Sequence, residues 1–139
     1  MTPDDEKALL EIVAGLVPAT AQQVGVALGK LTIRLSEITA QLAQADDEAT
    51  RLTEEHDVAF DTAYLREMEQ DGRLGFHSVA KATARQETRD LRLRMEVAKA
   101  NVRQLDKAHR TLDRRIDVGR TQAATVRTEA RTVGYGGAA

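Results

Sequence analysis

The chain of 139 residues contains no cysteine and no tryptophan, and aromatic residues make up only 3% of it. The absence of cysteine excludes disulfides, thiolate catalysis and sulfur-ligated metal sites together. The apolar 42% consists mostly of Ala, Leu and Val, whereas a globular enzyme core normally uses more large side chains. The composition therefore favours a core only two or three helices wide.

Proline is also scarce, because only Pro3 and Pro18 are present and both lie near the N-terminus. The first six residues include Asp4, Asp5 and Glu6 and no basic side chain, whereas a secretory signal needs positive charge there, so we expect no export signal. Residues 9–28 are apolar enough to raise the question of a membrane span, but Glu11 and Pro18 interrupt the run. We therefore expect no membrane association.

The C-terminal half carries a long helical repeat. Apolar, small or uncharged residues recur at alternating spacings of four and three, which is the heptad pattern of a coiled coil. These positions are Ala84, Thr88, Leu91, Met95, Ala98, Val102, Leu105, His109, Leu112, Ile116, Gly119, Ala123, Val126, Ala130 and Val133. The pattern predicts one uninterrupted helix of about 50 residues. Its narrow apolar stripe must be covered by a partner helix.

A second heptad array precedes the first and offers that partner. Its positions are Leu28, Leu31, Leu35, Ile38, Leu42, Ala45, Ala49, Leu52, His56, Ala59 and Ala63. A glycine-containing turn near 71–77 separates the arrays, so we predict an antiparallel hairpin. With the turn centred near Arg73, Leu35 faces Leu112 and Leu31 faces Ile116.

The N-terminal segment predicts a short third helix. Thr2 can cap it, Pro3 suits its first position, and Pro18 ends it. Its apolar face can fold back where Gly119 and the pair Gly25 and Gly29 thin the hairpin; this face comprises Leu9, Ile12, Val13 and Leu16.

The predicted fold is therefore all-α. It consists of a short amphipathic helix over residues 1–18, a long antiparallel two-helix coiled-coil hairpin over 19–133, and a flexible tail over 134–139 that Gly134 separates from the helix.

Charge is divided between the two halves of the chain. Residues 1–72 hold 5 basic and 15 acidic residues, a net charge of −10, whereas residues 73–139 hold 15 and 7, a net charge of +8. The last helix carries the candidate binding residues, which are Arg103, Lys107, Arg110, Arg114, Arg115, Arg120 and Arg127. This basic surface can contact a protein partner or follow a phosphate backbone. The helix lacks aromatics for base stacking and contains interspersed acids, so we favour a protein partner and keep nucleic acid as the alternative.

The histidines do not form a predicted site. His56 and His109 occupy heptad positions, but in the hairpin register they face Leu91 and Ile38 rather than each other. His77 has no evident partner for nucleophilic catalysis, and no phosphate-binding loop or zinc pattern is present. We therefore expect no enzymatic activity, no catalytic residue, no metal and no cofactor.

An acidic tip beside the predicted turn leaves a third reading open. The tip residues are Asp61, Glu67, Glu69 and Asp71, beside Arg66 and Arg73. An acidic tip on a helical hairpin resembles the secondary-channel transcript-cleavage factors of bacterial RNA polymerase. That resemblance implies an arm that delivers carboxylates and a magnesium ion. The globular second domain of that family is missing, so a solvated loop is the favoured reading.

The runs Arg114-Arg115-Ile116-Asp117-Val118-Gly119-Arg120-Thr121 and Val126-Arg127-Thr128-Glu129-Ala130-Arg131 resemble the endings of small coiled-coil accessory proteins of bacteriophages that infect high-GC Gram-positive bacteria. The resemblance implies a phage accessory protein in the host cytoplasm or the virion, and it transfers no functional residue. We expect a helical adaptor, inhibitor or virion-associated protein. A homo-oligomer remains open, because Val24, Phe60, Tyr64 and Phe76 offer apolar flanks to a second copy.

Overall fold

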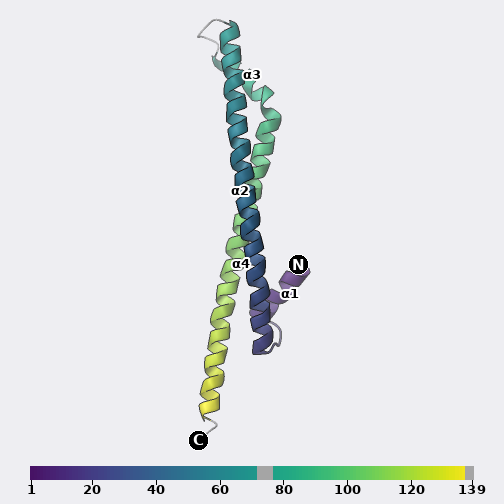
Figure 1. Cartoon of the computed structure of the whole chain (residues 1–139), viewed down its shortest axis with the longest axis vertical. Helices are drawn as coiled ribbons and strands as arrows, with labels where there is room; N and C mark the ends of the chain where they lie inside the picture. The colour runs from purple at the N-terminus through teal and green to yellow at the C-terminus, as the bar shows by residue number, and fades with distance from the viewer. Residues whose placement is uncertain (72–76, 137–139) are drawn as a thin grey trace. The chain divides into compact units, whose positions relative to one another are not determined.

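The computed structural model describes residues 1–71 and 77–136, leaving out the side chains at positions 71, 126, 130 and 132–136. Within these ranges the regular elements are α1 (Pro3–Val13), α2 (Ala21–Asp71), α3 (His77–Glu87) and α4 (Arg89–Gly136), all of them α-helices (Figure 1). The all-α prediction is thus confirmed. The predicted turn falls largely on residues 72–76, which lie outside the described residues, as do residues 137–139.

Two reciprocal capping boxes fix the starts of α1 and α2. The Asp5 backbone amide donates to Thr2 Oγ1 at 3.1 Å, and the Thr2 amide donates to Asp5 Oδ2 at 3.0 Å. At α2 the Gln23 amide donates to Thr20 Oγ1 at 3.2 Å, and the Thr20 amide donates to Gln23 Oε1 at 2.8 Å. Both satisfy amides that have no partner inside the helix. The helix starts predicted at Thr2 and Thr20 are therefore confirmed.

A glycine rather than Pro18 ends α1. Gly15 has a φ of +74°, a left-handed conformation that favours glycine. Its amide donates to the Ile12 carbonyl at 3.2 Å, and the Leu16 amide donates to the Glu11 carbonyl at 3.0 Å. This is the hydrogen-bond pattern of a Schellman motif. The helix consequently ends at Val13, earlier than the predicted end at Pro18.

The predicted uninterrupted C-terminal helix is divided at Thr88, between α3 and α4. Thr88 Oγ1 donates to the Ala84 carbonyl at 2.7 Å, an interaction that often bends helices. The backbone bonds from Thr88 to Ala84 (3.0 Å) and from Arg92 to Thr88 (2.9 Å) continue the helical pattern. The chain therefore changes direction at Thr88 without losing its helical hydrogen bonds (Figure 1).

The C-terminal end of α4 also differs from the prediction, because the helix continues through Gly134 to Gly136. Glycine is compatible with helical backbone, and it ends a helix only where it turns left-handed, as Gly15 does.

The chain divides into two compact units. The first, called here the terminal unit, comprises Met1–Ala40 and Asp106–Ala139, and the second, the middle unit, comprises Gln41–Leu105. In the terminal unit α1 joins the first part of α2 and the last part of α4. Its buried cluster contains Val13, Ala27, Leu31, Ile38, Leu112 and Ile116. Leu31 and Ile116 belong to one cluster, which is consistent with their predicted pairing.

The interior of the middle unit is formed by α2, α3 and the start of α4. Its buried residues are Ala45, Ala49, Leu52, Ala63, Ala80, Ala84, Thr88 and Met95. At its surface Arg66 of α2 pairs with Glu87 of α3, and hydrogen bonding to Glu87 raises the pKa of Arg66. Apart from Ala27 and Ala80, the described buried residues of α2, α3 and α4 fall on the predicted heptad positions. Val13 falls on the predicted apolar face of the N-terminal helix.

Candidate partner-binding groove

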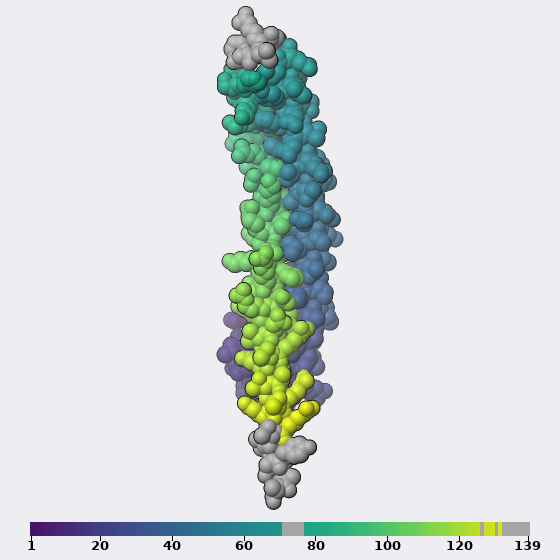
Figure 2. Space-filling model, turned by 90° about the vertical axis from the view of Figure 1, so that its left-hand side faces the viewer, coloured from purple at the N-terminus to yellow at the C-terminus, as the bar shows by residue number. Residues whose placement is uncertain are grey.

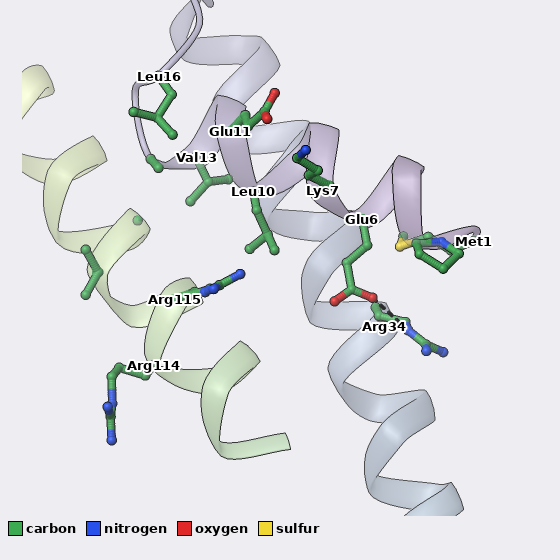
Figure 3. A pocket seen from close by; sticks show the side chains of 14 residues that line it. Met1, Glu6, Lys7, Leu10, Glu11, Val13, Leu16, Arg34, Arg114 and Arg115 are labelled. Carbon is green, nitrogen blue, oxygen red and sulfur yellow. Dashed lines mark hydrogen bonds and ion pairs between the residues drawn. The ribbon is translucent and has the colours of Figure 1, made fainter. Parts of the chain in front are cut away.

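A groove of about 620 Å³ lies in the terminal unit between α1 and α4 (Figure 3). We call it the α1–α4 groove. It is lined by Met1, Pro3, Glu6, Lys7, Leu10, Glu11, Val13, Ala14, Leu16, Arg34, Arg114, Arg115, Val118 and Gly119. Its volume falls within the range of about 300–1,000 Å³ that is usual for ligand sites.

Gly119 allows α1 to approach α4. A Cβ atom added to Gly119 would lie 1.9 Å from Val13 Cγ1, and Val13 is itself buried. The predicted folding of the N-terminal helix onto Gly119 is therefore confirmed. The same prediction for Gly25 and Gly29 is wrong, because no atom lies within 4 Å of a Cβ added at either position. Val13 and Gly119 both line the groove.

The walls of the groove are apolar and partly open to solvent. Leu10 and Val13 point from α1 toward α4 (Figure 3). Leu16, which follows Gly15, is 75% exposed, and Val118 of α4 is 52% exposed. The groove therefore leaves apolar surface uncovered beside a well-packed contact.

The rim of the groove carries more positive than negative charge. Four lining residues are cationic and two are acidic: Lys7, Arg34, Arg114 and Arg115 against Glu6 and Glu11. Arg34 Nε lies 3.3 Å from Glu6 Oε2, so the charges of these two residues neutralise each other.

The remaining rim cations differ in direction. Arg115 extends from α4 toward α1 beside Leu10, whereas Arg114 points away from α1 (Figure 3). Lys7, Arg114 and Arg115 form no ion pair within the described part of the chain. Unmatched positive charge therefore lies beside the apolar walls.

The seven predicted basic residues are divided between the two units. All are exposed on α4, but Arg103 belongs to the middle unit and the other six to the terminal unit. Two are paired locally, Arg110 with Asp106 at 3.1 Å and Arg120 with Asp117 at 3.8 Å. Only Arg114 and Arg115 line the groove. Figure 2 shows part of the α4 surface of the terminal unit in yellow-green, with α1 in purple at one edge.

Two of the three histidines, His56 and His77, contact acidic or aromatic side chains. His56 Nδ1 lies 3.2 Å from Asp57 Oδ1, and the His56 ring stacks on Phe60 with centroids 6.2 Å apart. Tyr64 stacks on Phe60 in turn, and its hydroxyl contacts His77 Nδ1. The described residues contain no group of three His, Cys, Asp or Glu that could hold a metal ion.

The acidic tip is only partly described. Glu67 Oε1 lies 3.8 Å from Arg66 Nη2, and Arg66 also contacts Glu87. The side chains of Asp71 and Arg73 lie outside the described residues.

The sequence did not predict that Lys7, Leu10 and Val118 line a common groove. No motif marks them, because the groove exists only once α1 is placed against α4. The available signal was Gly119, a glycine at a heptad position next to Ile116 in the repeat.

No helix in the described part of the chain combines the length and the apolar character that a membrane span requires. Comparison with known proteins found no match to this chain among protein-family models, curated proteins or solved structures.

Proposed function

We propose that this protein is a non-enzymatic helical interaction protein that binds a protein partner in the α1–α4 groove. The observation that supports this proposal is exposed apolar surface, at Leu16 and Val118, beside the unpaired cation Arg115. Open apolar patches with a polar rim are typical of protein interaction sites. A groove between two helices can receive the apolar face of a third.

A photo-crosslinking amino acid at position 16 tests this site, with the same amino acid at the exposed position Thr111 of α4 as the control. In a lysate of the bacterial host, we expect a discrete protein adduct from position 16 and none from position 111. Equal labelling at both positions, or no adduct at position 16, would count against the proposal.

The proposal includes the antiparallel hairpin. Its support is that Leu35 packs against the buried cluster that contains Leu112, its predicted partner, and that Leu28 Cδ2 would lie 3.4 Å from a Cβ added at Gly119. Because the chain lacks cysteine, spin labels can be attached at Ala45→Cys and Val102→Cys alone. Packed helix axes lie about 8–10 Å apart, so a short distance within one chain is expected. A long distance would indicate an intermolecular coil instead.

The cellular setting we propose is that of a bacteriophage accessory protein, in the host cytoplasm or associated with the virion. This rests on the resemblance of residues 114–131 described above. Immunodetection in purified virions and in the infected-cell cytoplasm would distinguish the two locations.

Nucleic-acid binding is the second candidate, because five of the seven predicted cations have no ion pair within the described residues: Arg103, Lys107, Arg114, Arg115 and Arg127. Fluorescence anisotropy with labelled DNA and RNA tests it. Backbone binding predicts an affinity that falls steeply between about 50 and 200 mM salt and on reversal of the charges of Arg114 and Arg115. No binding at low salt would remove this candidate.

A further inference from the structure

We propose that the occupant of the α1–α4 groove is an amphipathic helix of a partner protein whose apolar stripe is flanked by acidic residues. This inference rests on the proposed function and specifies the chemistry of the partner.

The apolar stripe follows from the walls of the groove. Leu10 and Val13 face α4 from one side, while Leu16 and Val118 leave apolar surface exposed. The 11 residues of α1 extend over about 16 Å, or three helical turns. An occupant of matching length presents apolar residues at positions i, i+3 or i+4, and i+7.

The acidic flanks follow from the charge of the rim. Lys7 on α1 and Arg114 and Arg115 on α4 have no ion pair in the described structure, and Glu11 is the one lining acid without an ion pair there. An occupant with basic flanks would place like charges beside these side chains. An acidic occupant would neutralise them, and complementary charge sets both specificity and orientation.

Arg115 is expected to contribute most to this recognition. Its side chain extends toward α1 beside the apolar wall, whereas Arg114 points away (Figure 3). A guanidinium can form two parallel hydrogen bonds with one carboxylate, and such bonds strengthen where water is partly excluded.

The test uses the full chain and three fluorescein-labelled peptides of 14 residues. The first has leucines on one helical face with glutamates flanking them. The second keeps the leucines and replaces every glutamate by lysine, and the third has the composition of the first in scrambled order. By fluorescence anisotropy we expect the first peptide to bind at least about tenfold more tightly than either control.

Variants locate the binding site. Arg115→Glu should weaken binding of the acidic peptide about tenfold or more, and Arg114→Glu should weaken it less. Lys107→Glu is the matched control, because it reverses the same charge on the same exposed helix outside the groove. Leu16→Ser tests whether the apolar wall contributes to binding. Because Leu16 is exposed, the helix content of this variant, measured by circular dichroism, should not change.

Three results would overturn the inference. Equal or tighter binding of the lysine peptide would show that the groove takes helices without requiring acid, leaving the proposed function intact. No binding of any peptide would show that the groove does not take an isolated helix, and crosslinking at position 16 would then decide the proposed function alone. Self-association that Arg115→Glu abolishes would make a second copy the occupant. Its candidate segment is the part of α2 that holds the exposed Val58 and Leu65 (67% and 58%) together with the exposed acids Asp57 and Asp61.

Discussion

The terminal and middle units share one heptad spacing but fill it with side chains of different size. In the described part of the middle unit, five of the eight buried residues are alanine. In the buried cluster of the terminal unit only one of six is alanine, and the others are Val13, Leu31, Ile38, Leu112 and Ile116. Spacing thus sets which face of each helix is buried, whereas side-chain size sets how much apolar area is buried there.

This difference explains why α1 packs in the terminal unit. Large side chains keep helices apart and leave apolar surface that α1 covers with Leu9, Leu10, Ile12 and Val13. Alanines allow close approach of two helices and leave little apolar area for another. The candidate groove is therefore a consequence of the larger core.

Removing a large side chain from the terminal core should have the largest effect. Leu31 is 0% exposed, so Leu31→Ala loses buried apolar area and leaves a cavity among Leu and Ile side chains. We expect destabilisation by about 2–5 kcal/mol in chemical unfolding. Hydrogen exchange should rise in residues 21–40 and less in 77–87. An equal rise in both would show that the units are not independent.

In the middle unit, a side chain that is too large should destabilise the core by overpacking it. Ala84 is fully buried in an alanine-rich interior, so Ala84→Leu forces the helices apart. We expect a loss of about 1–3 kcal/mol, again by chemical unfolding. Ala82→Leu, at an exposed position of the same helix, is the control and should be nearly neutral. A neutral Ala84→Leu would mean that the middle unit has room for large residues.

The end of α1 offers a smaller test of the third helix. Gly15→Ala places a side chain at a φ of +74°, which should cost about 1–2 kcal/mol. Gly25→Ala is the matched control, because Gly25 lies inside α2 with open space around it. It should stabilise the protein by about 0.5–1 kcal/mol, and thermal unfolding measures both. A stable Gly15→Ala variant would indicate that α1 does not need this cap.

The smallest expected effect is at the start of α1, where the stability of the protein should depend on pH. A hydrogen bond from the Thr2 backbone amide, followed by one from the Thr2 hydroxyl, lowers the pKa of the Asp5 carboxyl. Because this pKa is depressed, the stabilisation is present above the ordinary pKa of an aspartate and is lost as pH falls through the lowered value. Thr2→Ala should raise the pKa of Asp5 in an NMR titration, whereas Thr20→Ala should leave it unchanged. An unchanged value in Thr2→Ala would exclude a contribution from the hydroxyl.

The sequence by itself determined the helices and their buried faces. Heptad positions such as Leu31, Ala84 and Ile116 are buried because helical periodicity places them on one side whatever the partner is. The caps at Thr2 and Thr20 were equally predictable, since they depend on residues three apart. The break at Thr88 and the end of α1 at Gly15 were missed, because a threonine or a glycine does not reveal its backbone conformation in the sequence.

Only the tertiary structure decided the candidate site. Arg114 and Arg115 were predicted as part of a basic surface, but Lys7, Leu10 and Val118 join them only because Val13 packs on Gly119. Lys7 and Leu10 are about a hundred positions from Arg115 and Val118 in the chain. Their proximity depends on which helix packs against Gly119, a residue without a side chain. Local periodicity specifies faces, whereas packing between distant segments specifies which side chains meet.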